Sequence, residues 1–386
     1  MITGLGLGGA ETMLFRLLSD GQSRNYRQSV ICLMDEGHYG PLLRAAGIPV
    51  HFVNLRPNKL PSFRAVFDLI HLAIKQKPNL IVGWMYHGAV AGRILQLMLR
   101  WFCWRSSDLV LNIRHSLEDL SNEKKMTSFL IHYCGRIGRG KSVRKIIYNS
   151  KASATQHENL GYPSEKTYVI ANGFDTSTFA PFIGARDSLL KNLRLKKHHI
   201  LVGLVARYHP VKDFPCFISA AALVARQRNK ARFVLVGRNV TLDNKLLCDL
   251  VEEHGLAEIS FMLGEKDRIA SIYSGLDILV SSSISEAFSN TIGEACSSGT
   301  PCVVTDVGDS KYIIGNSGLA VPPRSPGDLA DAIIELVDFG SERRERLGRS
   351  ARDRVISYFS LSKVKTRYEE LFLESFPGYK INGKRS

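Results

Sequence analysis

The sequence LDILVSSSISEAFSNTIGEACSSGTPCVVTDVG, residues 276–308, decides the fold. It begins and ends with short apolar runs that have the composition of buried strands, and the residues between them have the pattern of a helix. A strand, a helix and a second strand in this order form the crossover unit of a parallel sheet. Ligands of such sheets bind beyond the carboxyl ends of the strands, so the stretch also indicates where a site is expected.

Strands and helices alternate strictly on both sides of the segment 176–199, which is polar, contains Pro181 and Gly184 and ends in a basic run. Strict alternation with mostly apolar strands predicts parallel sheets covered by helices on both faces. We therefore expect an α/β protein with two Rossmann-like, doubly wound domains that face a deep interdomain cleft. The expected organisation is an N-terminal domain at 1–175, a linker at 176–199, a C-terminal domain at 200–360 and a final helix at 361–377.

The composition excludes several classes of protein. The 386 residues are 45% hydrophobic and 23% charged, which is typical of a globular protein with room for two cores. No uninterrupted apolar run reaches the ~20 residues of a membrane span, and the N-terminus lacks the basic and apolar regions of a secretory signal. The seven cysteines show no metal-ligand spacing, which argues against zinc and a disulfide scaffold and favours a reducing, cytoplasmic compartment.

The net charge of +15 has a local source in the first half of the chain. Between 124 and 157 there is no Asp or Glu, and the basic residues there are Lys124, Lys125, Arg136, Arg139, Lys141, Arg144, Lys145 and Lys151. Such a segment suits an anionic membrane surface, a nucleic acid or a phosphorylated acceptor, and it also fits an ordinary solvated face. A nucleic acid would explain the charge alone, since no aromatic-rich stacking platform is evident, and we expect none as a partner.

The N-terminal sequence TGLGLGGAET, residues 3–12, is rich in glycine. Its spacing matches the dinucleotide fingerprint G-x-G-x-x-G, and Asp35 follows at about the place of a ribose-binding acid. Three glycines at this spacing are a weak signal, and only Met1 and Ile2 precede them where a strand should be. Taken alone, the loop fits a nicotinamide enzyme or any other site that needs glycine beside a phosphate.

Two carboxylates, Glu286 and Glu294, flank the expected start of the helix near Asn290. The first turn of a helix has unpaired N–H groups and a positive dipole end, which together bind anions. Glu286 follows the strand and could hold sugar hydroxyls, whereas Glu294 lies inside the helix and could reach a ribose diol. Two acids at this spacing also occur by chance on solvated helices, so the neighbouring residues have to decide.

Those neighbours make the match specific. Segments 285–290, 293–295, 299–304 and 306–308 together resemble the donor-sugar motif of the retaining family 4 glycosyltransferases, whose fold is named GT-B. VGLVARYHPVKDF looks like the family's phosphate-binding segment, FVLVGRN and FMLGEKD resemble the strand ends that frame the base, and IANGFDTSTF resembles the start of the linker. The resemblance covers nearly the whole chain and implies that the final helix packs back on the first domain.

The resemblance implies roles for individual residues. The implied catalytic residues are His115, Glu286, Arg207 and Lys212. The implied residues for the donor nucleotide and its phosphates are Gly8, Gly9, Arg207, Lys212, Gly237, Arg238, Leu263, Phe288, Ser289, Asn290, Thr291 and Glu294. His87 and Arg114 are the candidates for binding the acceptor. Without the resemblance, each histidine is more often a structural group, and Arg114 could simply pair with Asp119.

The resemblance also reinterprets the N-terminal glycines. In this family a loop of the type GGAE follows the first strand and approaches the donor diphosphate, and this replaces the nicotinamide interpretation. The family's first strand has several apolar residues before the loop, and here there are almost none. Either this strand is truncated, which would leave the first sheet without one of its central strands, or the true start of the chain lies upstream of Met1.

The implied function is that of a retaining glycosyltransferase. It would move a sugar from a nucleotide sugar, UDP- rather than GDP-linked, to a saccharide or lipid-linked saccharide in the synthesis of bacterial lipopolysaccharide, capsule or exopolysaccharide. No D-x-D occurs, so we expect no metal and no cofactor besides the nucleotide sugar. The basic segment 124–151 predicts peripheral attachment at the inner face of the cytoplasmic membrane. Two alternatives stay open: a nucleotide-sugar epimerase or hydrolase on a GT-B-like fold, and a non-catalytic nucleotide-sugar-binding protein.

Overall fold

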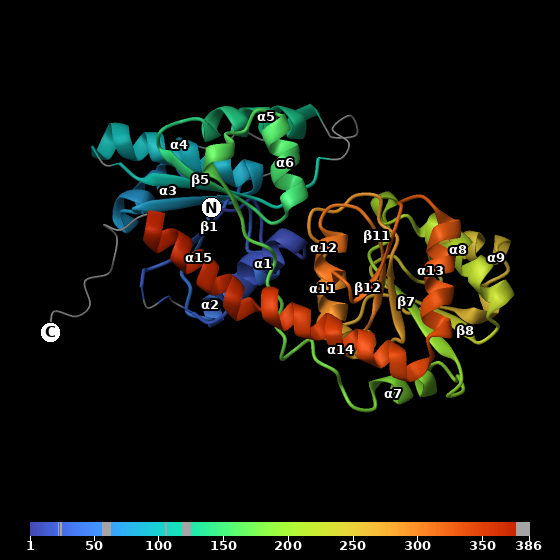
Figure 1. The fold of residues 1–386 in the computed structure, drawn as a ribbon. Helices are drawn as coiled ribbons and strands as arrows, with labels where there is room; N and C mark the ends of the chain where they lie inside the picture. The colour runs from blue at the N-terminus through green and yellow to red at the C-terminus, as the bar shows by residue number, and fades with distance from the viewer. Residues whose placement is uncertain (22, 24, 56–62, 105, 118–124, 376–386) are drawn as a thin grey trace. The chain divides into compact units, whose positions relative to one another are not determined.

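The computed structural model divides into two compact units (Figure 1). Unit 1 is formed by Met1–Gly173 together with the segment that begins at Leu361, and unit 2 is formed by Phe174–Ser360. Each unit is built on parallel strands, so the expected α/β class with two Rossmann-like sheets is confirmed. The residues that the structure describes are 1–21, 23, 25–55, 63–104, 106–117 and 125–375.

Unit 2 is built on one six-stranded parallel sheet. Its strands are β7 (Ile200–Val205), β8 (Ala231–Val236), β9 (Ser260–Met262), β10 (Ile278–Ser281), β11 (Cys302–Thr305) and β12 (Gly318–Val321). Its α-helices are α7 (Ala185–Asn192), α8 (Phe214–Gln227), α9 (Lys245–Glu253), α10 (Ile269–Gly275), α11 (Asn290–Ser297), α12 (Ser310–Ile314), α13 (Pro326–Asp338) and α14 (Gly340–Tyr358). The order across the sheet is β12-β11-β10-β7-β8-β9, so strand addition changes direction between β7 and β10.

The core of unit 2 follows from its apolar strands. β7 is buried along its whole length, as its sequence ILVGLV predicts for a central strand of a parallel sheet. Helices α8 and α13 pack together over one face, where Phe217 and Leu336 share a core with the strands. Figure 1 shows α11 and α12 over the opposite face. With both faces covered, the ends of the strands are the edges left for a site.

Helix α11 lies unusually close to Phe174 because residue 293 is glycine. A Cβ at Gly293 would stand 2.0 Å from the Phe174 ring. Phe174 is fully buried and stacks on Phe288, with 6.2 Å between the ring centroids. This contact fixes the position of α11 against the rest of unit 2.

The segment expected to be an interdomain linker, 176–199, folds into unit 2. Its helix α7 packs on α10, and the Arg186 guanidinium donates to the Asp277 carboxylate at 2.9 Å. The chain passes from unit 1 to unit 2 between Gly173 and Phe174. The segment is polar partly because one side of its short helix α7 faces solvent.

Unit 1 contains a two-stranded sheet, β1-β2, and a four-stranded sheet, β3-β4-β5-β6. Its strands are β1 (Val30–Cys32), β2 (Val50–Phe52), β3 (Leu80–Trp84), β4 (Asp108–Ile113), β5 (Val143–Tyr148) and β6 (Thr167–Val169). Its α-helices are α1 (Gly9–Leu18), α2 (Tyr39–Ala45), α3 (Phe63–Gln76), α4 (Met85–Cys103), α5 (Lys125–Gly138), α6 (Lys151–Asn159) and α15 (Leu361–Ser375). The strands within each sheet are parallel.

Residues 1–3 lie between β1 and β3 and join the two sheets. The Ile2 N–H donates to the Ile31 carbonyl at 3.0 Å, and the Met1 carbonyl accepts from the Trp84 N–H at 2.8 Å. Residues 1–3 thus lie beside the carboxyl ends of β1 and β3. Toward the opposite ends, residues of β1, β3, α1 and α15 line a groove of about 1380 Å³.

Helix α15 belongs to unit 1 because its apolar face is buried there. Val364, Tyr368 and Leu371 share a core with Leu5 and Met13, which come from the glycine loop and α1. The last described helix of the chain thus supports the first one. Figure 1 shows α15 in red beside the blue α1.

We expect Gly293→Ala to destabilise unit 2 by about 1–3 kcal/mol, because the added methyl group would overlap the Phe174 ring in a closely packed core. Helix propensity alone predicts the opposite sign, since alanine stabilises a helix interior over glycine by about 1 kcal/mol. Urea unfolding followed by far-UV circular dichroism measures the change. The three tryptophans, Trp84, Trp101 and Trp104, all lie in unit 1, so their fluorescence follows that unit separately.

Gly327→Ala in α13 is the matched control, because a Cβ there meets no atom within 4 Å. The control should leave the stability of unit 2 unchanged or raise it slightly. A Gly293→Ala protein as stable as the control would contradict the steric argument.

Candidate active site

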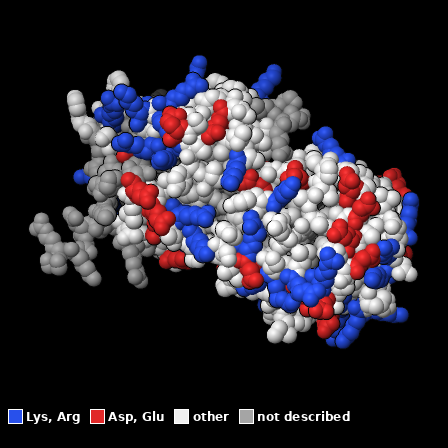
Figure 2. All heavy atoms as spheres, in the orientation of Figure 1, with Lys and Arg blue, Asp and Glu red and all other residues white. Residues whose placement is uncertain are grey.

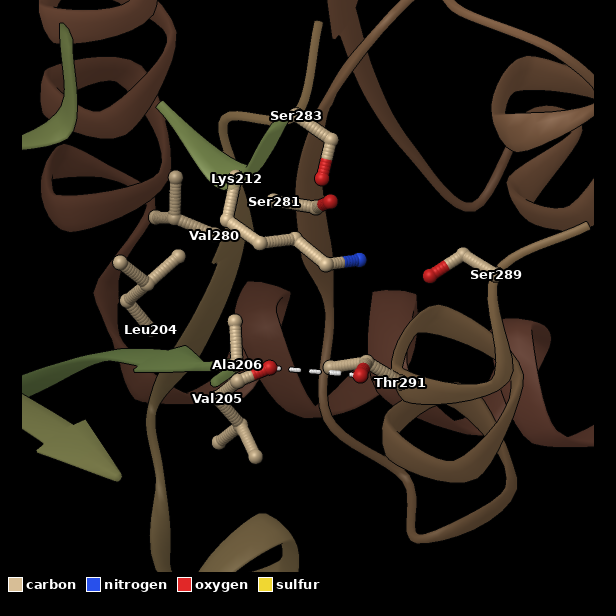
Figure 3. Close-up of a pocket in the computed structure, with 9 residues that line it drawn as sticks. All are labelled: Leu204, Val205, Ala206, Lys212, Val280, Ser281, Ser283, Ser289 and Thr291. Carbon is tan, nitrogen blue, oxygen red and sulfur yellow. Dashed lines mark hydrogen bonds between the residues drawn. The ribbon is translucent and has the colours of Figure 1, made fainter. Parts of the chain in front are cut away.

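A small pocket opens in unit 2 where the strand order changes direction (Figure 3). The ends of β7 and β10, one lysine and the start of α11 form its walls. The lining residues are Leu204, Val205, Ala206, Lys212, Val280, Ser281, Ser283, Ser289 and Thr291. The crossovers leave β7 and β10 in opposite directions, so this edge of the sheet stays uncovered, and ligands of doubly wound sheets bind at such an edge.

Lys212 supplies the positive charge of this pocket. It ends the 3-10 turn η3 (Pro210–Lys212), and Figure 3 shows its amine pointing into the space between Ser281 and Ser289. The amine donates to Glu286 Oε1, which also accepts from Ser283 Oγ at 3.0 Å. The side chains of Lys212 and Glu286 are 22% and 15% exposed, so solvent screens this ion pair less than a surface pair.

The loop that carries Glu286 contacts two other segments of unit 2. Ser282 Oγ donates to the carbonyl of Lys212 in η3 at 2.8 Å. Gly308, which has φ +55°, packs closely against the loop, because a Cβ there would stand 1.9 Å from the Glu286 carbonyl oxygen. Thr305 Oγ1 adds a bond of 2.5 Å to the Ser283 carbonyl. The carboxylate is therefore set in place before any ligand arrives.

The N-terminus of α11 forms the opposite wall of the pocket. Ser289 precedes the helix and is buried, with its hydroxyl turned toward the pocket in Figure 3. Thr291 Oγ1 donates to the Val205 carbonyl at 3.3 Å, which ties the helix start to the end of β7. Asn290 is the first residue of the helix. First-turn N–H groups beside a lysine ammonium make this a place for an anion.

Glu294 lies further along α11 and is 9% exposed. Its Oε2 accepts a hydrogen bond from the Tyr273 hydroxyl at 3.2 Å, and Tyr273 comes from α10. A buried carboxylate needs such donors to offset the loss of water. The expected role of Glu294 in binding a ribose diol stays a prediction.

Arg207, Arg238 and Leu263 follow the carboxyl ends of β7, β8 and β9, on the same edge of the sheet as the pocket. Gly237 brings the first two loops together, since its φ is +145° and a Cβ there would stand 2.0 Å from the Ala206 carbonyl oxygen. Arg207 is exposed. Both arginines thus lie in loops whose backbones touch.

Phe288, expected among the donor-binding residues, has its side chain inside unit 2. It is 4% exposed and packs against Phe174 and Phe359, at centroid distances of 6.2 and 5.5 Å. Its ring supports the Glu286 loop from within and does not line the pocket.

In unit 1 the glycine loop meets the turn after β3. Gly8 precedes and Gly9 begins α1, and the Glu11 carboxylate lies against Gly8 where a Cβ would stand. Trp84 Nε1 donates to the Ala10 carbonyl at 3.0 Å, which ties the end of β3 to the first turn of α1. Partial burial raises the pKa of Glu11 above its usual value.

The chain passes directly from β3 into α4 through Met85, which has φ +62°. A positive φ at a residue with a side chain is strained, and such residues concentrate at functional sites. After this turn Tyr86 is buried and His87 is exposed. Partial desolvation lowers the pKa of His87.

His115 follows β4 and contacts the buried Tyr86. The Tyr86 hydroxyl lies 3.3 Å from His115 Nδ1 and 2.7 Å from His157 Nε2. Ser153 Oγ donates to the His115 carbonyl at 2.6 Å, so α6 is tied to the loop after β4. His115 is therefore one end of a hydrogen-bonded group of side chains.

Arg114, a candidate for the acceptor, is buried in unit 1. Its Nη1 donates to Asn112 Oδ1 and to the Tyr368 hydroxyl, both at 3.1 Å, and its Nη2 donates to Asn172 Oδ1. These bonds link β4 to α15. Asp119, the alternative partner, lies outside the described residues.

Two family models match the chain. Residues 7–178 match Glycosyltransferase Family 4, and residues 199–338 match Glycosyl transferases group 1. The chain belongs to the family 4-type glycosyltransferases. The resemblance seen in the donor-sugar motif is thereby confirmed, and this glycosyltransferase has the GT-B fold that the family implies.

Individual relatives of the glycosyltransferase are distant. UDP-Gal:alpha-D-GlcNAc-diphosphoundecaprenol alpha-1,3-galactosyltransferase of Escherichia coli is 22% identical over 337 residues, which are 86% of this chain and 84% of that enzyme. D-inositol 3-phosphate glycosyltransferase of Paenarthrobacter aurescens is 28% identical over 214 residues, which are 54% and 52% of the two chains. The crystal structure of Anabaena HepE in complex with UDP has a TM-score of 0.82 at 22% identity, with 97% and 98% coverage. That likeness shows the fold.

Sequence reasoning missed Tyr86, His157 and Tyr273. Each is joined to a predicted site residue by a side chain that comes from another element, so no local motif marks it. In the sequence, His157 is notable only as the last residue before Glu158 ends the acid-free segment. In the structure of the glycosyltransferase, His157 is fully buried.

Acid should weaken unit 1 through His157. Burial, with a contribution from the nearby His115, lowers the pKa of His157 from 6.5 to about 4. Between these values the unfolded chain binds a proton that the folded unit does not. The free energy of unfolding should therefore be unaffected above about pH 7 and should fall by roughly 3 kcal/mol as the pH drops to 4.

Urea unfolding followed by tryptophan fluorescence at pH 7, 5.5 and 4.5 measures this loss. His157→Gln offers an amide donor and an amide acceptor at the same place without a titrating group, and it should remove the loss. Wild type and variant with the same pH dependence would rule out His157 as the source.

Proposed function

We propose that this glycosyltransferase moves a sugar from a nucleotide sugar, with UDP preferred over GDP, to a saccharide or lipid-linked saccharide, and that it retains the anomeric configuration. The proposed pathway is the synthesis of a bacterial surface polysaccharide such as lipopolysaccharide, capsule or exopolysaccharide. The observation that carries the proposal is the pocket of unit 2, where Lys212 and the start of α11 lie beside Glu286.

The cations of this edge suit a diphosphate. Lys212 points into the pocket, and Arg207 lies in the loop that leads to it. Partial burial lowers the pKa of His209, and the nearby charges of Arg207 and Lys212 lower it further. Each charge-assisted hydrogen bond to a phosphate contributes about 1.5–3 kcal/mol.

The carboxylates suit the sugars. Glu294 would accept from the ribose hydroxyls, and Glu286 would accept from the hydroxyls of the transferred sugar. As the bond from sugar to diphosphate breaks, negative charge grows on the leaving diphosphate and positive charge grows on the sugar ring. Lys212, Arg207 and the α11 N-terminus would stabilise the first, and we propose that His115 contacts the transferred sugar.

Relatives support the choice of donor and acceptor. Structures of Anabaena HepE were solved in complex with UDP and with UDP-glucose. The Escherichia coli relative is named for UDP-Gal and for an acceptor linked to diphosphoundecaprenol. These names describe those proteins, and they make a UDP-sugar and a lipid-linked saccharide the first substrates to test.

Lys212→Gln should raise the Kd of UDP by about 10- to 150-fold, because it removes one charge-assisted bond to the diphosphate. Isothermal titration with UDP, GDP and ADP measures the affinity and the preference for the base. Lys245→Gln, at an exposed lysine of α9 in the same unit, is the control and should keep the wild-type Kd. An unchanged Kd for UDP in Lys212→Gln would exclude the pocket as the diphosphate site.

The reaction itself separates the remaining alternatives. We propose that the cations of the chain neutralise the diphosphate without a metal; among the residues that the structure describes, no three or more His, Cys, Asp or Glu form a metal-binding group. Chelator should therefore leave the initial rate unchanged. Proton NMR of the product reads the anomeric configuration, and release of free or altered sugar without an acceptor would identify a hydrolase or epimerase instead.

We further propose that unit 1 attaches to an anionic membrane surface. No helix in the described ranges has both the length and the apolar character to cross a membrane. Helices α4 and α5 pack together, and Trp101, Phe102 and Phe129 on them are 77%, 72% and 63% exposed. Figure 2 shows Lys and Arg gathered over the part of unit 1 where Figure 1 labels α3 and α4. Exposed aromatics beside cations are typical of interfacial binding.

The basic segment adds exposed cations. Those described as exposed are Lys125, Arg136, Arg139, Lys141, Arg144 and Lys151, and Lys124 lies outside the described residues. Reversing Arg136 and Lys141 to Glu should weaken binding to phosphatidylglycerol vesicles by about tenfold or more, since each surface cation contributes about 1 kcal/mol. Co-sedimentation measures binding, with Lys245→Glu of unit 2 as the control. Equal binding to uncharged phosphatidylcholine vesicles would overturn the electrostatic part of the proposal.

A further inference from the structure

A chain of four polar groups runs through the interior of unit 1 and ends at His115. The Ser153 carbonyl lies 2.7 Å from His157 Nδ1, and His157 Nε2 lies 2.7 Å from the Tyr86 hydroxyl. The same hydroxyl lies 3.3 Å from His115 Nδ1. Tyr86 is 4% exposed and His157 is fully buried, so water does not compete for these bonds.

The positions of the protons along this chain follow from its fixed end. A carbonyl oxygen only accepts, so His157 Nδ1 must carry a proton and donate it to Ser153. A neutral His157 then has a lone pair on Nε2, and the Tyr86 hydroxyl must donate to it. Tyr86 has one proton, so toward His115 its oxygen accepts, and His115 Nδ1 must be the donor.

We propose that Tyr86 and His157 are positioning residues that hold His115 in the tautomer with the proton on Nδ1. His115 Nε2 then carries a lone pair at the carboxyl edge of the unit 1 sheet. A lone pair accepts a hydrogen bond or a proton from a hydroxyl group, and it repels a phosphate oxygen. The inference rests on the proposed function in one respect, namely that His115 contacts a substrate.

The surroundings of the chain keep it in this state. The groups packed around it are the Cys134 thiol, which donates to the Tyr86 carbonyl, and the rings of Tyr148 and Tyr162, which lie 5.2 and 5.0 Å from the His157 ring. Burial lowers the pKa of His157 to about 4 and raises the pKa of Cys134 to about 12, so both groups are neutral at ordinary pH. A protonated His157 would donate from Nε2 and reverse the chain.

Ser153 strengthens the arrangement from a second direction. Its hydroxyl donates to the His115 carbonyl at 2.6 Å, while its own carbonyl fixes His157. Ser153, near the start of α6, therefore holds the backbone of His115 in position. It also orients the ring of His157, which acts on the tautomer of His115 through Tyr86. The bond between Tyr86 and His115 Nδ1 follows a known pattern, in which a neighbouring group binds one ring nitrogen of a histidine and thereby orients the nitrogen that acts on the substrate.

Long-range nitrogen–proton NMR on the full chain with labelled histidine reads the tautomer directly. His115→Gln assigns the signals of His115. We expect wild-type His115 to carry its proton on Nδ1, and we expect Tyr86→Phe and His157→Leu to lose this preference. His157→Gln should keep it, because an amide can accept from Tyr86 and donate to Ser153. Tyr168→Phe, at an exposed tyrosine of unit 1, is the control.

The kinetic readout is separate from the spectroscopic one. Tyr86→Phe and His157→Leu should lower kcat by about 10- to 100-fold with the Kd of UDP unchanged, and His157→Gln should restore most of kcat. Tryptophan fluorescence during unfolding checks that each variant folds. If Tyr86→Phe fails to fold, the pair His157→Leu and His157→Gln carries the test.

The outcomes separate this inference from the proposed function. A proton on Nε2 of His115 in the wild type overturns the inference, whatever the activity. If Tyr86→Phe changes the tautomer of His115 but leaves kcat unchanged, the positioning role of Tyr86 is overturned. Loss of UDP binding or of transfer in the wild type would instead overturn the proposed function and leave the tautomer measurement standing.

Discussion

The change in strand order between β7 and β10 is the constraint on which the site of unit 2 depends. Crossovers leave these neighbouring strands in opposite directions, so helices cover both faces of the sheet and leave their carboxyl ends open. Three short segments fill that edge: η3 with Lys212, the loop with Glu286, and the start of α11. Glycine contacts at Gly308 and Gly293 bring the loop and the helix into place, and a side chain at either position would push the segments apart.

The two units handle buried polarity in different ways. In unit 2 a lysine and a carboxylate form an ion pair in a partly sheltered pocket, where both side chains keep some contact with solvent. In unit 1 the side chains of Tyr86 and His157 are buried, burial lowers the pKa of His157 so that it is neutral at ordinary pH, and hydrogen bonds order the two side chains and His115. The first arrangement suits a charged ligand, and the second suits a hydroxyl.

The sequence predicts those parts of the structure that depend on local pattern. The run ILVGLV and the strict alternation of strands and helices predict the parallel sheets, and the residues around Glu286 predict the family. The direction of single side chains is set by packing, which local pattern does not contain. Phe288 turns inward to Phe174, and Arg114 is taken up by three side chains of unit 1. The contact between Tyr86 and His157 joins residues 71 positions apart, so no motif could have indicated it.

The carboxyl edge of unit 1 is held by a very short stretch of chain. The Met1 carbonyl accepts from Trp84, and a Cβ at Gly88 would stand 2.5 Å from the same oxygen. Trp84 in turn bonds to Ala10 in the first turn of α1. These contacts fix the glycine loop, the end of β3 and the strained turn into α4 as one piece, although the opposite ends of the same strands line a groove. His115 lies at the same carboxyl edge of unit 1. Its position relative to the glycine loop therefore depends on these contacts.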